Sequence, residues 1–188
     1  AGCPSAADAR NSGWIGFNIS STRKVHPMPD KITPDTIKSI RILTVPPERV
    51  FQAWADREER LQWDVPGNDW VIAEFQHDFR EDGIEKSRFG PEGDPMAESY
   101  GRYLLIDPPN CIVNAGVMRS VQSGEVSSTT MTTLHLEPEG SGTRLTLIDQ
   151  SVFLGKGETA DMRRHGWDEI LDKLADYLKN VKGTKNAD

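Results

Sequence analysis

Near residue 159 the spacing of hydrophobic residues changes from every second position to the repeat of an α-helix. Before this point, short runs of alternating apolar residues are separated by Gly and Pro turn signals, a pattern typical of strands with one buried face. After it, Met162, Gly166, Ile170 and Leu174 form one helical stripe. A series of strands followed by one long helix, without strand–helix alternation, predicts an α+β protein with an antiparallel sheet.

The predicted elements follow one another with short connections. The first strand covers residues 37–45 and ends at Pro46-Pro47. Two short helices follow, and the second starts at Asp56 with an acidic cap and Glu59 three residues later, close to a capping box. Six further strands are predicted at residues 71–79, 84–89, 100–106, 111–118, 127–137 and 144–153. The helix at 159–182 is the only long amphipathic element predicted, so we expect the sheet to wrap around it.

A chain of 188 residues suits one domain, which we place at residues 36–182. Residues 1–35 are rich in Ser, Asn, Asp, Pro and Gly and show neither repeat, which predicts a disordered N-terminal tail. Residues 183–188 are predicted to be a disordered C-terminal tail. An alternative is that Trp14 and Phe17 dock the first segment onto the domain. If they do not, deletion of residues 1–33 is expected to cost little stability.

Charge and cysteine content narrow the range of partners. The 29 acidic and 22 basic residues give a net charge of −7, which does not support binding to nucleic acid or to an anionic membrane surface. No apolar run approaches the roughly 18–20 residues that a membrane-spanning helix needs. The two cysteines, Cys3 and Cys111, are too few for a disulfide framework. We therefore expect a cytoplasmic protein with no nucleic-acid or membrane partner.

Several short motifs, taken in their order and spacing, resemble one known family. They are Val45-Pro46-Pro47-Glu48-Arg49-Val50-Phe51-Gln52-Ala53-Trp54, Leu61-Gln62-Trp63, Gly101-Arg102-Tyr103-Leu104 before Asp107-Pro108-Pro109, Gly142-Thr143-Arg144-Leu145-Thr146, and Gly166-Trp167 before Leu171 and Leu174. This series resembles the stand-alone domains related to the C-terminal half of the activator of Hsp90 ATPase, in the START-like or Bet v 1-like (SRPBCC) superfamily. The resemblance covers about residues 37–181.

The resemblance implies the helix-grip fold, in which a curved antiparallel β-sheet with two short helices wraps around a long C-terminal α-helix. The sequence departs from the pattern at Asp64, where relatives often carry a second Trp, and at Glu81–Ile84, where relatives often carry a Gly pair. We expect a small hydrophobic or aromatic molecule to bind in a cavity between sheet and helix, without a cofactor and without catalysis. The resemblance also implies two alternatives. One is a module that binds a chaperone or other protein, with a role in the stress response, and the other is a polyketide cyclase or aromatase-like enzyme.

The candidate pocket residues are those expected to face one another between sheet and helix. His77 alternates with Phe75 and Phe79, so it is either a hydrogen-bonded core histidine, which we favour, or the polar handle of an apolar pocket. Small residues such as Ala115 and Gly166 are expected to leave volume there. The predicted ligand-binding residues are Trp63, Phe75, His77, Tyr100, Leu104, Val113, Ala115, Met162, Trp167 and Leu171.

No motif for a catalytic nucleophile, a phosphate-binding loop or a dinucleotide site is present, and we expect neither catalytic residues nor a metal site. Asp161 and His165 are four residues apart, which an ion pair within a helix explains as well as metal binding does. Asp149 interrupts an otherwise apolar run. Because an unpaired buried carboxylate is costly, we expect Asp149 to pair with Arg102 or Arg144, or to lie at the open end of the sheet.

Overall fold

The computed structural model describes residues 31–155 and 157–184, which form one antiparallel sheet and three helices. The elements are β1 (Thr33–Leu43), α1 (Pro47–Ala55), α2 (Arg57–Trp63), β2 (Trp70–His77), β3 (Ile84–Pro91), β4 (Ala97–Asp107), β5 (Cys111–Ser120), β6 (Val126–Glu139), β7 (Gly142–Phe153) and α3 (Ala160–Thr184). The predicted α+β class and the predicted order of elements are confirmed.

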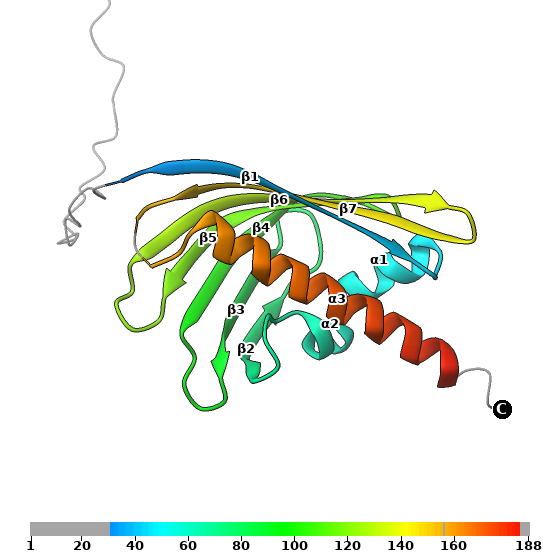
Figure 1. The fold of residues 1–188 in the computed structure, drawn as a ribbon, viewed down its shortest axis with the longest axis horizontal. Coiled ribbons are helices and arrows are strands. Elements are labelled where there is room, and N and C mark those ends of the chain that lie inside the picture. Colours follow the sequence, from blue (N-terminus) through cyan, green and yellow to red (C-terminus); the bar gives the residue numbers. More distant parts are fainter. Residues whose placement is uncertain (1–30, 156, 185–188) are drawn as a thin grey trace, which may run out of the picture.

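The seven strands lie in the order β1-β7-β6-β5-β4-β3-β2, and every neighbouring pair is antiparallel. Only β1 pairs with a strand distant in sequence, β7, and the other strands form a meander. The sheet curves over α3, and α1 and α2 lie toward the C-terminal half of that helix (Figure 1). This arrangement is the helix-grip fold that the family resemblance implied.

The N-terminal boundary of the fold lies at β1, which begins at Thr33 and pairs along its whole length with β7. Residues 1–30 of the predicted N-terminal tail, including Trp14 and Phe17, lie outside the described residues. At the other end, the backbone of α3 continues to Thr184.

The two short helices start where the sequence indicates. Pro47 occupies the first turn of α1, where a missing N–H costs nothing. Asp56 caps α2, and its carboxylate accepts a hydrogen bond from the backbone N–H of Glu59 at 2.9 Å. The predicted capping position at Asp56 is therefore confirmed. The cap separates two helices that would otherwise run together, which allows α2 to turn toward the sheet and α3.

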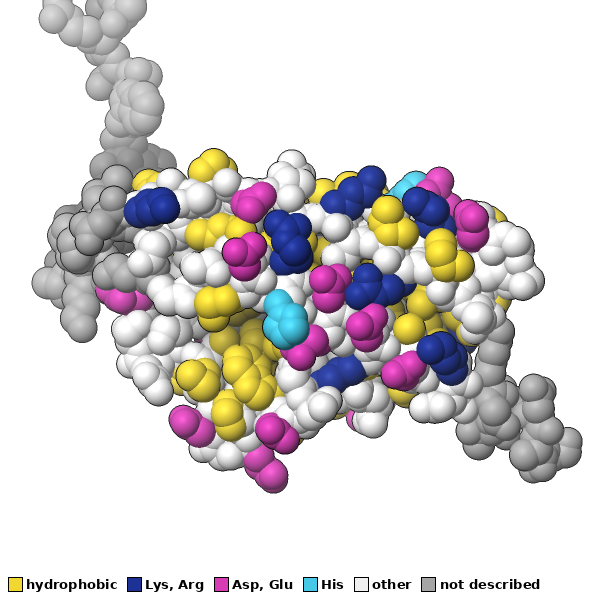
Figure 2. Space-filling view, in the orientation of Figure 1, with side chains coloured by type: hydrophobic (Ala, Val, Ile, Leu, Met, Phe, Trp, Pro, Cys, Tyr) yellow, Lys and Arg dark blue, Asp and Glu magenta, His cyan; other side chains and the backbone are white. Residues whose placement is uncertain are grey.

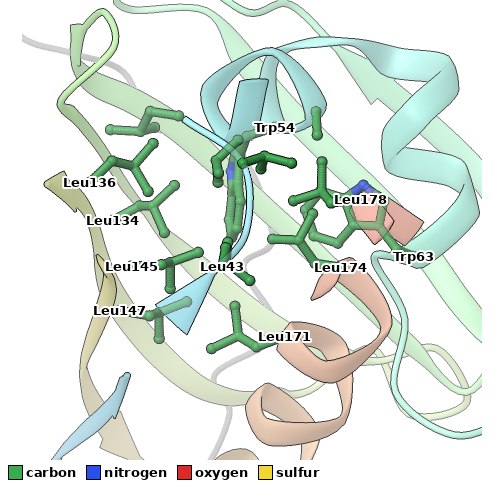
Figure 3. Packing of buried hydrophobic residues seen from close by; sticks show 14 of the residues in the cluster. Leu43, Trp54, Trp63, Leu134, Leu136, Leu145, Leu147, Leu171, Leu174 and Leu178 are labelled. Carbon is green, nitrogen blue, oxygen red and sulfur yellow. The ribbon is translucent and has the colours of Figure 1, made fainter. Parts of the chain in front are cut away.

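Leucines from three elements form the centre of the hydrophobic core (Figure 3). Leu134 and Leu136 come from β6, Leu145 and Leu147 from β7, and Leu171, Leu174 and Leu178 from α3. Each of these side chains is at most 2% exposed. Trp54 of α1 and Trp63 of α2 complete this cluster, and their rings lie 5.0 Å apart. The core thus fills the space between β6, β7 and the C-terminal half of α3.

A pair of glycines allows a close approach of the β4 and β5 backbones. Gly101 and Gly116 lie directly opposite each other. A Cβ at Gly116 would collide with the carbonyl oxygen of Tyr100 and would lie 2.6 Å from the Cα of Gly101. No side chain fits in such a close approach of two backbones. This close approach lies within the sheet that curves over α3 (Figure 1).

Bulges in β2 and β4 change which residues face the helix. In β2 the register shifts between Ile72 and Glu74, so the alternation predicted from Val71 to His77 is broken at Ala73. Val71 is consequently 40% exposed. In β4 the register shifts between Tyr103 and Leu105, and Leu104 is the extra residue. A bulge inserts one residue, which reverses the facing of every residue on one side of it.

Candidate ligand-binding site

A hollow lies beside the N-terminal half of α3, and hydrophobic side chains line its base (Figure 2). Strand pairing identifies the residues that face it. Ile112 of β5 pairs with the core residue Leu134, so Asn114, Gly116 and Met118 share the inward face with Ile112. Further pairing continues this face onto Ser99 of β4, Ser87 of β3 and Phe75 of β2.

The inward face differs in packing between its two halves. On β7, Leu145 and Leu147 are completely buried. On the opposite half of the same face, apolar side chains remain partly exposed, including Phe75, Phe89, Ala97 and Met118. The small residues Ser99 and Gly101 lie between them in the sheet. This half of the inward face is therefore less completely covered by α3 than the half that forms the core.

Four predicted pocket residues lie away from this hollow. Ala115 and Val113 alternate with the inward residues of β5 and therefore lie on the outer face of the sheet. Tyr100 pairs with Val117 on that same face and is 43% exposed, and Leu104 at the bulge is 50% exposed. Sequence reasoning placed these four residues inward because they are apolar. On β5, however, the more apolar face is the outer one.

The residues predicted on the helices have three different environments. Met162 is 59% exposed, whereas Leu171 is completely buried in the core. Trp63, also predicted to bind the ligand, is 1% exposed and packs in the core. Trp167 is half-buried and packs against the core from the N-terminal half of α3. A Cβ at Gly166 would meet only Pro66, at 3.8 Å, so this glycine does leave space beside the helix.

A buried arginine that sequence reasoning missed lies near one end of the hollow. The guanidinium of Arg60 is stacked near Trp54, Trp63 and Phe75, with ring centroids 5.1, 5.4 and 5.8 Å from its central carbon. It forms ion pairs with Asp64, one turn later on the chain, and with Glu85 of β3 at 3.4 Å. The spacing of Arg60 and Asp64 was a visible signal for this pair, but Glu85 becomes a partner only through the fold.

His77 belongs to the same cluster. Its Nε2 lies 2.9 Å from the carbonyl oxygen of Ala55. Its Nδ1 lies 3.2 Å from the Tyr103 hydroxyl and 3.3 Å from a carboxylate oxygen of Glu85, and the hydroxyl donates to that carboxylate. The His77 side chain is 2% exposed. Both ring nitrogens thus have partners inside the protein, which agrees with a hydrogen-bonded core histidine rather than a handle for a ligand.

Burial and mutual charge shift the ionisation of this cluster. Burial raises the pKa of Asp64 to about 6, because the nearby Arg60 only partly offsets the desolvation and Glu85 adds repulsion. Burial would also raise the pKa of Glu85, but the charge of Arg60 and hydrogen bonds from His77 and Tyr103 lower it to about 2. Burial and the Glu85 charge raise the pKa of the Tyr103 hydroxyl. Asp64 is therefore the carboxylate of the pair that takes up a proton first.

A second charged cluster holds the N-terminal half of α3 on the sheet. Asp149 of β7 is completely buried and accepts hydrogen bonds from Thr130 at 2.8 Å and from the Trp167 indole at 2.7 Å. Arg163 forms an ion pair with Asp149 at 3.0 Å and another with Glu158. The expectation that Asp149 needs a partner is correct, but the predicted partners are wrong. Because Arg163 and Trp167 are four residues apart on α3, one helical face supplies both groups.

Four buried donor nitrogens have no hydrogen-bond partner among the described residues. Two of them belong to Arg49 and Arg88, whose guanidinium groups form ion pairs. The two neutral donors are the indole nitrogen of Trp63 and the amide nitrogen of Asn114. Asn114 faces inward, between Tyr103 on β4 and Thr132 on β6. It therefore lies where the packed core ends and the hollow begins.

No three His, Cys, Asp or Glu side chains are grouped to hold a metal ion in the part of the chain that the structure describes. The Nε2 atom of His165 lies 3.5 Å from a carboxylate oxygen of Glu169, one turn later on α3. Within residues 31–155 and 157–184, no helix has the length and apolar character required to cross a membrane.

Comparison with known proteins supports the assignment that the fold suggests. The family described as Activator of Hsp90 ATPase homolog 1-like protein matches residues 44–179. The Mll3558 protein from Rhizobium loti is 33% identical, with a TM-score of 0.70, and the match covers 78% of this chain and 99% of that one. A protein from Rhizobium leguminosarum is 28% identical, with a TM-score of 0.72, over 80% of this chain and 97% of the other.

The AHSA1 protein from Silicibacter pomeroyi is 22% identical, with a TM-score of 0.65, over 78% of this chain and 99% of that one, and this likeness shows the fold. No curated protein matches the chain. The family match extends from the residue after β1 to near the end of α3, so it includes both charged clusters and the hollow. The chain belongs to the family of Activator of Hsp90 ATPase homolog 1-like proteins, within the START-like superfamily.

Proposed function

We propose that this domain binds a small hydrophobic or aromatic molecule in the hollow between the N-terminal half of α3 and the inward faces of β2 to β5. The observation that supports this proposal is the contrast within one sheet face, where Leu145 and Leu147 are fully buried but Phe75 and Met118 are not. Protein interiors are normally close-packed, so partly exposed apolar residues on a concave face are typical of a ligand site.

The site residues that we propose differ from those predicted from the sequence. Phe75 stays in the proposed site, together with Trp167 on the opposite side. Ser87, Ser99 and Met118 replace the four residues of the outer face. His77 contributes by holding Tyr103 and Glu85 in place rather than by touching the ligand.

A paired substitution tests the location of the site. Ser99→Phe adds a large side chain on the inward face, whereas Ala115→Phe adds the same side chain on the outer face of the neighbouring strand. Binding of a neutral hydrophobic dye such as Nile red is measured by fluorescence. We expect saturable binding to the unchanged protein, at least tenfold weaker binding to Ser99→Phe, and little change for Ala115→Phe.

Thermal melts of both variants show whether each remains folded, since overpacking costs about 1–3 kcal/mol. If a panel of neutral hydrophobic probes shows no saturable binding to the unchanged protein, the proposal is wrong. If a folded Ser99→Phe variant binds as well as the unchanged protein does, the molecule binds elsewhere.

The second candidate is a module that binds a chaperone or another protein. It is favoured by exposed apolar residues on the outer face of the sheet, including Tyr100, Leu104 and Leu105 at 43%, 50% and 41% exposure. Leu105→Asp should weaken binding of such a partner without affecting binding of the dye.

A cytoplasmic location and a role without catalysis remain predictions. An assay of cyclase turnover on polyketide substrates tests the prediction that the protein is not a catalyst.

A further inference from the structure

Between its apolar side chains, the inward surface around the hollow carries small and neutral polar residues. Ser87 pairs with Ser99 across β3 and β4, and Gly101 pairs with Gly116 across β4 and β5. Asn114 lies two positions before Gly116 on the same face. Hydroxyl and amide groups of this kind form hydrogen bonds without adding charge.

The charged side chains at the two ends of the hollow are already paired with one another. At one end Arg60 lies between Asp64 and Glu85. At the other end Asp149 and Glu158 share Arg163. Among the described residues, these two clusters therefore offer no unpaired counter-ion to a charged ligand. A buried charge without a partner is strongly disfavoured, so a carboxylate in the hollow would lose its hydration without compensation.

On the inward face of the sheet, Asn114 carries a polar group that remains unsatisfied. Its amide nitrogen is buried and has no hydrogen-bond partner among the residues that the structure describes. Its amide oxygen lies so close to Gly101 that a Cβ there would collide with it. A buried N–H donor without an acceptor is rare in folded proteins and raises the free energy of the unliganded state. An acceptor brought by a ligand would remove this cost.

We propose that the ligand is uncharged and carries one hydrogen-bond acceptor, such as a ketone, ester or ether oxygen, which the Asn114 amide binds. This inference rests on the proposed function and specifies the class of molecule. In the unliganded protein the nitrogen is closed to water, and a ligand oxygen reaches it after a small rotation of the Asn114 amide. The last torsion of an asparagine side chain has a broad energy minimum, so this rotation is easy.

Three probes that share one ring system test the proposal at pH 7.5. Naphthalene carries no polar group, 2-acetylnaphthalene carries a neutral acceptor, and 2-naphthoate carries a charged acceptor. Affinities are measured by NMR titration, with the side-chain amide signals of Asn114 as a direct readout. We expect the ketone to bind roughly three- to tenfold more tightly than the hydrocarbon. The carboxylate should bind more weakly than both, and only the ketone should shift the Asn114 amide signals strongly.

Asn114→Leu keeps the approximate volume and removes the donor, while Gln150→Leu makes a similar change on the outer face of β7. The preference for the ketone over naphthalene should fall below twofold in Asn114→Leu and should persist in Gln150→Leu. The affinity for naphthalene should stay similar in both variants. A ketone preference that survives in Asn114→Leu, equal binding of ketone and hydrocarbon, or tightest binding of the carboxylate would overturn this inference but leave the proposed function intact. Absence of binding by all three probes and by Nile red would overturn both.

Discussion

The indole N–H of Trp167 donates a hydrogen bond of 2.7 Å to the completely buried carboxylate of Asp149. This contact fixes the N-terminal half of α3 against β7, and Arg163 supports it from one turn earlier on the helix. Ser39 of β1 adds a hydrogen bond of 3.0 Å to Asp168 on the same helix. Because α3 is held on the side of β1 and β7, its other side is left facing β2 to β5. The hollow is therefore a consequence of where the helix is anchored.

Trp167→Phe should destabilise the domain because the buried Asp149 carboxylate loses a donor. A hydrogen bond to a charged group is worth about 1.5–3 kcal/mol, and each kcal/mol lowers the melting temperature of a domain of this size by about 2–4 °C. Trp70→Phe is the matched control, because Trp70 is half-buried and contacts Phe89 by its ring. Thermal melts compare the two variants, and equal losses would show that the Asp149 hydrogen bond contributes little.

Arg60→Met should be among the most damaging single substitutions in the domain. It leaves Asp64 and Glu85 without their common partner in a buried site, which typically costs about 3–5 kcal/mol. The control is Arg57→Met on the same helix, because Arg57 is exposed and its pair with Glu58 is worth at most about 1 kcal/mol. Urea denaturation measures the free energy of unfolding of both variants. Adding Asp64→Asn and Glu85→Gln to Arg60→Met should restore part of the loss if unpaired charge is its cause.

The pH dependence of stability should show two opposite contributions from the Arg60 cluster. The pKa of Asp64 is raised from 3.8 to about 6, so the folded state binds more protons between these values and stability falls as pH rises through them. The pKa of Glu85 is lowered from 4.5 to about 2, so its contribution is present above pH 4.5 and is lost as pH falls toward 2. Each slope is at most about 1.4 kcal/mol per pH unit.

Urea denaturation at several pH values separates these contributions. Asp64→Asn should flatten the pH dependence of the unfolding free energy between about pH 4 and 6, the range between the unfolded and folded pKa values of Asp64. Glu85→Gln should flatten the loss at lower pH. A profile in which neither variant changes its own window would mean that other groups dominate the response to pH.

Gly116→Ala and Gly166→Ala should change stability in opposite directions. At Gly116 the added methyl group meets the backbone of β4, so we expect a loss of about 1–3 kcal/mol. At Gly166 the nearest atom is 3.8 Å away, and alanine is the better helix former by about 0.8–1 kcal/mol. Differential scanning calorimetry compares the two variants. A destabilised Gly166→Ala variant would indicate that Pro66 cannot tolerate the methyl group.

The polar residues of the inward face explain why the candidate site was harder to predict than the fold. On β5 the inward residues include Asn114 and Gly116, while Val113 and Ala115 lie outward. Burial of apolar residues is the usual guide to facing, and it fails where one half of a sheet face is left unfilled. A helix that covered this half closely would have selected larger apolar residues there. The mismatch between polarity and facing is thus a property of the site itself.

The sequence by itself determined the α+β class, the order of the elements, the cap at Asp56 and the long C-terminal helix, because these depend on periodicity and turn chemistry over a few residues. Only the tertiary structure decided which residues of β2 and β4 point inward, since a bulge of one residue at Ala73 or Leu104 reverses the alternation. The partners of Asp149 and Glu85 were also decided by the tertiary structure. A buried charge requires a partner, but nothing in local sequence says which distant residue the packing will bring to it.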